Sequence, residues 1–176
     1  HPPVDYACFC DSCIARFAVE SGVEIPRKEL VEAIRLGSTV NGVNVRRAWR
    51  DYSSRALTDI ACAAADAVHR VDDSIAIGYM VCNPGGHGYA PPDFKRWIEK
   101  GRNRDGTVYF RHGSGVYNDF SPYAHDSILM KNISIGRLCA MTEGPGVVNL
   151  TEEVTHPYNR RTKSMKITFL EAALNL

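Results

Sequence analysis

Residues 75–82 place the strongest constraint on the fold of this chain. This run of eight residues is almost wholly apolar, and turn-forming residues bound it, Asp72-Asp73-Ser74 before it and Asn83-Pro84-Gly85-Gly86 after it. A short apolar run between such boundaries is typical of a strand buried on both faces, as in a parallel sheet. The run therefore predicts a strand of an α/β protein.

Helical and strand patterns alternate along the rest of the chain. From Trp49 to Val71 apolar residues recur every three or four positions, which predicts a long amphipathic helix after a turn at Asn41-Gly42. Because helices separate the expected strands, the order predicts right-handed crossovers and a parallel sheet. Shorter helices are expected over residues 11–22, 27–36, 92–101, 121–141 and 163–174, and further strands over 107–110 and 147–150.

The number of strands limits which α/β fold the chain can complete. Three strands cannot close a barrel, and a full (β/α)8 (TIM) barrel takes roughly 250 residues. The chain has 176 residues and opens on a loop-like segment, His1-Pro2-Pro3, rather than on Met. We therefore expect residues 1–176 to form one incomplete piece of a (β/α)8 barrel, which would be inactive on its own.

Composition narrows the class of partner. A formal net charge of +1 gives no electrostatic argument for binding nucleic acid or an anionic membrane. No apolar run approaches the roughly 20 residues that span a bilayer. Six cysteines, three clustered and three scattered in apolar runs, suit a reducing compartment better than a disulfide scaffold. The sequence predicts a cytoplasmic protein with neither nucleic acid nor membrane as a partner, and it leaves homo-oligomerisation open.

A cysteine cluster lies directly ahead of the first expected helix. Cys8, Cys10 and Cys13 follow the pattern C-x-C-x2-C, which can place three thiolates around one Zn²⁺. A tetrahedral site needs a fourth ligand, which is either His1 or a residue outside the chain. The cluster predicts a structural zinc site, and the alternative is a set of reduced cysteines at a helix start.

Polar side chains gather where each expected strand ends. In parallel α/β folds chemistry collects beyond the carboxyl ends of the strands, and the three loops there are rich in polar, aromatic and glycine residues. Such loops suit a ligand with many hydroxyl groups, although glycine, asparagine and histidine are common in ordinary loops as well. The candidate substrate-binding residues are Asn83, Arg111, His112, Tyr117, His156 and Tyr158.

Glu152 and Glu153 are the candidate catalytic residues. They follow the third expected strand directly, and alternation along a strand lets only one of them point into a pocket. A retaining glycosidase uses one such carboxylate as its nucleophile and a second one about 5 Å away as acid and base. A partner carboxylate of that kind is not evident elsewhere in the sequence.

Several short segments together resemble the glycoside hydrolase family 42 group of β-galactosidases. They are Cys8–Phe17, Trp49-Arg50-Asp51-Tyr52, Val71–Gly78, and Glu152 ahead of His156-Pro157-Tyr158. The resemblance implies a (β/α)8 barrel that this chain covers from the loop after the fourth strand to the seventh helix. It also implies that Cys8, Cys10 and Cys13 are three of four zinc ligands, the fourth coming from an earlier segment.

The same resemblance implies a mechanism. The acid/base glutamate of that family ends the fourth strand, which would put it just upstream of His1. The nucleophile ends the seventh strand, which would make it Glu152 first and Glu153 second. The implied activity is retaining hydrolysis of a glycosidic bond, with a β-galactoside as one form of the carbohydrate substrate. The alternative is a non-catalytic carbohydrate-binding or zinc-stabilised structural barrel.

Overall fold

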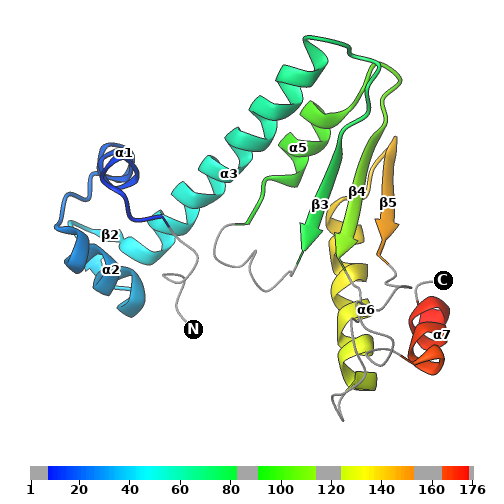
Figure 1. Ribbon diagram of the computed structural model, residues 1–176. Helices are drawn as coiled ribbons and strands as arrows, with labels where there is room; N and C mark the ends of the chain where they lie inside the picture. The colour runs from blue at the N-terminus through cyan, green and yellow to red at the C-terminus, as the bar shows by residue number, and fades with distance from the viewer. Residues whose placement is uncertain (1–7, 83–90, 114–123, 153–163, 175–176) are drawn as a thin grey trace. The chain divides into compact units, whose positions relative to one another are not determined.

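The computed structural model describes residues 8–82, 91–113, 124–152 and 164–174 (Figure 1). The chain forms two compact units, residues 1–63 with 85–93 and residues 64–84 with 94–176. The boundary between the units falls inside the 25-residue helix α3 (Val45–His69). Among the described helices, none is both long enough and apolar enough to cross a membrane.

The first unit is built from helices and one small hairpin. Helices α1 (Asp11–Ser21) and α2 (Arg27–Leu36) confirm the two predictions made for this region. Each ends at a left-handed glycine, Gly22 with φ 70° and Gly37 with φ 71°. Glycine adopts this conformation without steric cost because it has no Cβ. The hairpin joins β1 (Thr39–Val40) to β2 (Val43–Asn44) through the predicted Asn41-Gly42 turn.

Aromatic side chains form the centre of the first unit. Trp49, which is 2% exposed, packs against the rings of Phe9, Phe17 and Tyr52, with ring centroids 4.8, 4.9 and 5.3 Å away. Phe9 lies between two cysteines of the C-x-C-x2-C cluster, so its stacking on Trp49 ties that segment to α3. The same packing fixes the start of α1 against the first unit's core.

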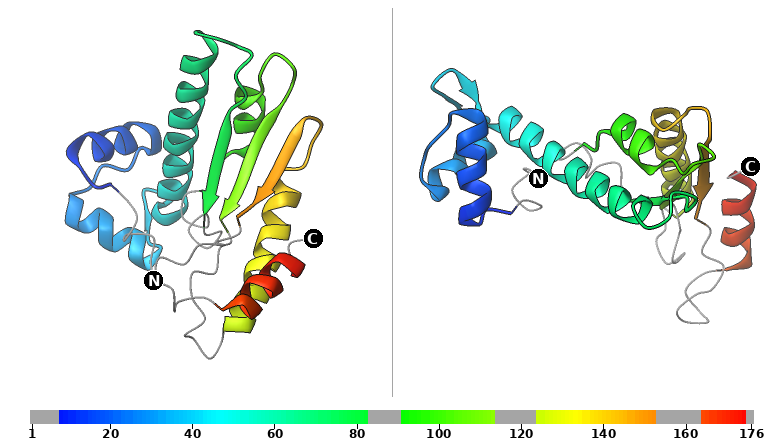
Figure 2. Two further views of the ribbon diagram at one scale, coloured as in Figure 1. Left: turned by 45° about the vertical axis from the view of Figure 1, so that its right-hand side comes forward. Right: turned by 90° about the horizontal axis from the view of Figure 1, so that it is seen from above.

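The second unit contains a three-stranded parallel sheet. Strands β3 (Gly78–Cys82), β4 (Val108–Gly113) and β5 (Val147–Thr151) lie side by side in that order and point the same way (Figures 1 and 2). Helix α5 (Phe94–Gly101) follows β3, α6 (Ala124–Met141) follows β4, and α7 (Met165–Leu174) follows β5. The predicted α/β class is confirmed, and within the described residues the strands form an open sheet rather than a closed barrel.

One face of the sheet is covered by helices. The ring of Tyr79 in β3 stacks on that of Trp97 in α5, with centroids 4.8 Å apart. The ring centroids of Phe110 in β4 and Phe94 in α5 are 5.9 Å apart. Val108, Phe110 and His112 of β4 all point to this face and are buried. The end of α6 covers the same face next to β5.

The opposite face of the sheet is open within the described residues. Met80 of β3 is 63% exposed and Leu150 of β5 is 45% exposed, and both lie in register with Arg111 of β4. The prediction that the strands are buried on both faces is therefore wrong for the described part of the chain. The reason is that the connecting helices α5 and α6 both pack on the same side, as consecutive right-handed crossovers in one direction require.

Two strands differ from their predicted bounds in a way that affects the site. β3 begins at Gly78 rather than at residue 75, and a turn precedes it in which the Ser74 hydroxyl donates a hydrogen bond to Asp72. β4 continues to Gly113, pairing residue by residue with β3, so Arg111 and His112 lie inside the strand rather than in the loop after it. Strand pairing on both sides overrides the weak strand preference of these polar residues.

Candidate functional site

An ion pair joins the carboxyl ends of β4 and β5. The Nη2 atom of Arg111 lies 2.8 Å from Oε1 of Glu152, and their side chains are 39% and 20% exposed. Arg111 is opposite Leu150 in the parallel register, and alternation places Glu152 on the same open face two residues later. The backbone N–H of Glu152 donates to the carbonyl of His112 at 3.2 Å, so the ladder holds Glu152 beside β4.

A buried polar chain lies on the other face of the same strands. The imidazole Nε2 of His112 is 2.8 Å from Oδ1 of Asn149, and the hydroxyl of Thr142 is 2.8 Å from that oxygen. His112 and Thr142 are both fully buried, and the Thr142 hydroxyl is also 2.9 Å from the carbonyl of Leu138 in α6. This chain ties the last turn of α6 to β4 and β5, because breaking it would leave buried polar atoms unsatisfied.

The predicted site residues therefore fall into three groups. Arg111 and Glu152 are in contact, whereas His112 is on the helix-covered face and turned away from them. The roles of Arg111 and His112 in substrate binding stay predictions, as does the catalytic role of Glu152. The remaining candidates lie outside the described residues: Asn83, Tyr117, Glu153, His156 and Tyr158.

Asn149 and Thr142 were not among the site residues predicted from the sequence. Asn149 stands within the apolar run 147–150, and an amide at such a position signals a buried hydrogen bond, because an unpaired one would be costly. Thr142 has no comparable signal, since it follows a helix where a hydroxyl is common. Its contact depends on the three-dimensional approach of α6 to β5.

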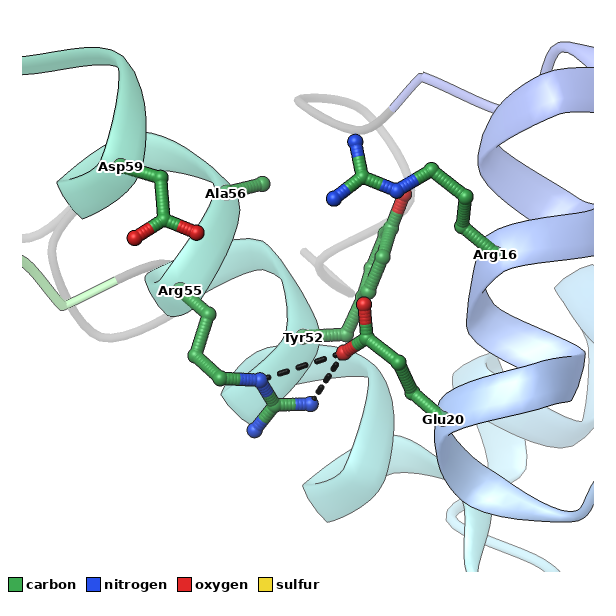
Figure 3. Close-up of a pocket in the computed structure, with 6 residues that line it drawn as sticks. All are labelled: Arg16, Glu20, Tyr52, Arg55, Ala56 and Asp59. Atoms are coloured by element: carbon green, nitrogen blue, oxygen red, sulfur yellow. Dashed lines mark hydrogen bonds and ion pairs between the residues drawn. The ribbon is translucent and has the colours of Figure 1, made fainter. Parts of the chain in front are cut away.

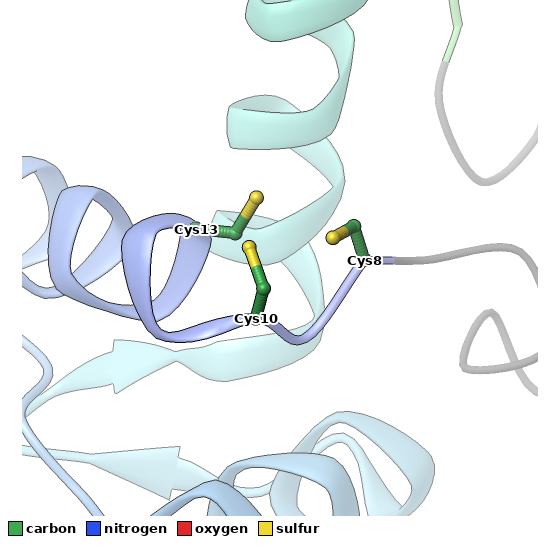
Figure 4. Close-up of side chains that lie close together, drawn as sticks. All are labelled: Cys8, Cys10 and Cys13. Carbon is green, nitrogen blue, oxygen red and sulfur yellow. The ribbon is translucent and has the colours of Figure 1, made fainter.

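The three clustered cysteines meet at the start of α1. Cys10 is the N-cap residue, Cys13 lies in the first turn, and Cys8 comes from the segment before the helix (Figure 4). Their sulfur atoms all lie within 4.8 Å of one another, and Cys8 and Cys10 are exposed while Cys13 is half-buried. Tetrahedral zinc with Zn–S bonds near 2.3 Å needs sulfurs about 3.8 Å apart, so small rotamer changes suffice. The cluster could bind a metal ion.

Hydrogen bonds shift the pKa values of Cys10 and Cys13 in opposite directions. The backbone N–H of Cys13, followed by the thiols of Cys8 and Cys13, lowers the pKa of Cys10. The hydrogen bond to Cys10 and then burial raise the pKa of Cys13. Cys10 therefore presents the thiolate that a metal requires more readily than Cys13 does.

Tyr52 of α3 lies next to the cluster. Burial, followed by a hydrogen bond with Cys13, raises the pKa of Tyr52 to about 12. Its phenol therefore stays protonated at neutral pH and can donate to the Cys13 sulfur. A donor of this kind orients a metal ligand and is typical of the second layer around metal sites.

A pocket of about 490 Å³ lies between α1 and α3 in the first unit, beside Tyr52. Both Nε and Nη2 of Arg55 donate to the same Glu20 oxygen, at 3.2 and 2.7 Å. This pair is exposed, so it contributes at most about 1 kcal/mol to stability. Its arrangement indicates a link between two helices rather than a catalytic centre. The lining residues are Arg16, Glu20, Tyr52, Arg55, Ala56 and Asp59 (Figure 3).

No protein-family model, curated protein or solved structure matches this chain.

Proposed function

We propose that this chain is part of a (β/α)8 barrel that hydrolyses a glycosidic bond with retention, and that Glu152 is its nucleophile. One observation carries the proposal. Glu152 is the first residue after β5, and its side chain lies on the open face of a parallel sheet, in contact with Arg111 of the neighbouring strand. Barrel enzymes place their catalytic side chains at this end of the strands.

The one-sided cover of the sheet supports the barrel. In a (β/α)8 barrel every crossover helix lies outside, and the inner strand face is covered only by the other strands. Here α5 and α6 both cover the face of Phe110, while Met80, Tyr109 and Leu150 of the opposite face are exposed in the described residues. Further strands of the intact protein would cover this apolar face by closing the barrel.

The proposed reaction has two steps at the anomeric carbon. An oxygen of Glu152 attacks that carbon, and the bond to the leaving oxygen breaks as a second carboxyl group gives that oxygen a proton. Water then attacks the same carbon and gives a proton to the second carboxylate. The bond between the carbon and Glu152 breaks, and its electron pair stays on Glu152. We propose that the second carboxyl group ends the strand preceding Cys8, as in the family that the chain resembles.

Substitution of the two adjacent glutamates tests this proposal. In the intact protein, Glu152→Gln removes the attacking oxygen and should lower turnover of an activated aryl glycoside by several orders of magnitude. Glu153→Gln is the comparison variant, because strand alternation predicts that only one of two adjacent carboxylates reaches a pocket. Added azide should restore turnover of Glu152→Ala only and should yield the inverted glycosyl azide. Full activity of Glu152→Gln would refute the assignment.

We also propose that the cysteine cluster holds a structural Zn²⁺. The sulfur spacing within 4.8 Å and the lowered pKa of Cys10 suit a thiolate site. Cys8, Cys10 and Cys13 would supply three ligands, and a segment outside the described residues would supply the fourth. A four-coordinate zinc has no open position for a substrate, so its contribution would be to hold the start of α1 in place.

The second candidate function is a zinc-stabilised barrel without catalysis. It is favoured by the engagement of Glu152 in an ion pair, since such a pair can serve structure alone. The glutamate variants separate the two candidates. If Glu152 has only a structural role, its substitution should change the stability of the protein and leave any glycosidase activity of the same sample intact.

A further inference from the structure

The contact between Arg111 and Glu152 points to a role for the arginine. We propose that Arg111 is a positioning residue that stabilises Glu152 as the departing carboxylate when the glycosyl–enzyme bond is broken. This inference rests on the proposed function of Glu152. The guanidinium Nη2 is 2.8 Å from Oε1 of Glu152, a distance typical of charge-assisted hydrogen bonds.

The fold holds the two groups together without help from a ligand. Arg111 lies within the central strand of the sheet, opposite Met80 on one side and Leu150 on the other. The next residue, His112, is anchored through Asn149, and its carbonyl accepts the N–H of Glu152. Both backbones are therefore fixed by strand pairing, and a preorganised ion pair of this kind needs little rearrangement during a reaction.

The ion pair has opposite effects on the two proposed steps. In the first step the negative charge of Glu152 is lost as its oxygen bonds to carbon, so the nearby cation slightly disfavours the attack. In the second step water attacks the anomeric carbon, its proton goes to the second carboxylate, and Glu152 leaves with the electron pair. Arg111 stabilises that emerging charge, because a carboxylate paired with a cation is a better leaving group.

Loss of the guanidinium should therefore slow the second step most. In Arg111→Met the glycosyl–enzyme should accumulate, so kcat and KM should fall together, each by about tenfold or more. Arg111→Lys keeps the charge but not the planar fork, and should recover part of kcat. These two effects differ from those of a residue that only binds the sugar, whose loss raises KM while kcat is kept.

The test uses the intact protein and the dinitrophenyl glycoside that it hydrolyses best. Rapid mixing with Arg111→Met should release a burst of about one dinitrophenolate per active site, and mass spectrometry should find the protein heavier by one glycosyl group. Arg104→Met is the matched control, because Arg104 precedes the same strand and pairs with exposed Asp73 at 3.9 Å. That variant should keep the kcat and KM of the unsubstituted protein.

Each other outcome overturns the inference in a distinguishable way. The Nε of Arg111 has no hydrogen-bond partner among the described residues, so contact with the substrate is the competing role. A raised KM at unchanged kcat would assign Arg111 to that role, and unchanged kinetics would assign it none. A loss of activity without a burst in both Arg111→Met and Arg111→Lys would assign it to structure. If Glu152→Gln also stays active, or no aryl glycoside is hydrolysed, both the proposed function and this inference are refuted.

Discussion

A single methyl group at Gly146 should disrupt the pairing of β4 with β5. Gly146 precedes β5 with a φ of 73°, and a Cβ at this position would lie 2.0 Å from the carbonyl oxygen of Gly106. Gly106 precedes β4 with a φ of 81°, but a Cβ there would meet no atom within 4 Å. The two glycines thus share a left-handed backbone and differ in the space around them. Gly106→Ala is the matched control for Gly146→Ala.

The expected cost of each substitution follows from this geometry. A left-handed alanine costs about 1–2 kcal/mol, which is the whole expected effect at Gly106. At Gly146 the overlap must be relieved by a shift of about 1 Å, since Cβ contacts below 3.0 Å are essentially never seen. That shift breaks the 3.0 Å hydrogen bond from Val108 N–H to the Gly146 carbonyl, which adds about 1–3 kcal/mol. Gly146→Ala should therefore cost about 2 kcal/mol more than Gly106→Ala.

Urea unfolding of the intact protein, followed by circular dichroism, measures this difference. The two variants should share the same m value while the midpoint of Gly146→Ala lies lower. Because the register of β4 and β5 also brings Arg111 to Glu152, Gly146→Ala should also lower the glycosidase activity that we propose. Equal midpoints for the two variants would show that the approach of the two turns is looser than the structure has it, and would refute the reasoning.

Two further predictions concern the cysteine cluster. Intact protein purified without chelator should contain about one zinc per chain. Cys13→Ser should lose most of this zinc, whereas Ser12→Ala should keep it, because Ser12 is not a proposed ligand. A zinc content below about 0.2 per chain in the unsubstituted protein would rule out the site. Tyr52→Phe removes the donor to Cys13 and should weaken zinc binding by about tenfold in a competition with a chromogenic chelator, while an unchanged affinity would mean that the Tyr52 hydroxyl does not act on the bound metal.

The helices of the first unit were predictable because their ends carry local signals. Gly22 and Gly37 close α1 and α2 where the sequence places them, and the Asn41-Gly42 turn is present. The hairpin around that turn was not predicted, since strands of two residues leave no alternating pattern to detect. Helix ends and turns that depend on neighbouring residues were therefore predictable from the sequence.

The two faces of the sheet could not be predicted from the apolar runs. A run such as 75–82 carries no alternation, so it does not tell which face the helices cover and which face they leave open. The extent of β4 was missed for a related reason. Arg111 and His112 read as loop residues, and only their pairing with Met80 and Val81 makes them part of a strand.

Once β4 is seen to include both residues, its alternation explains the chemistry of each face. His112 points under the helices, where burial is complete and its hydrogen bond to Asn149 is required. Arg111 points to the open face, where a charged group near the strand's end is tolerated only beside a counter-ion or water. Tyr109 and Leu150 on that face lie closer to the amino ends of their strands than Arg111 and Glu152 do. Polarity thus rises along the open face toward the carboxyl ends, where a parallel sheet places its ligands.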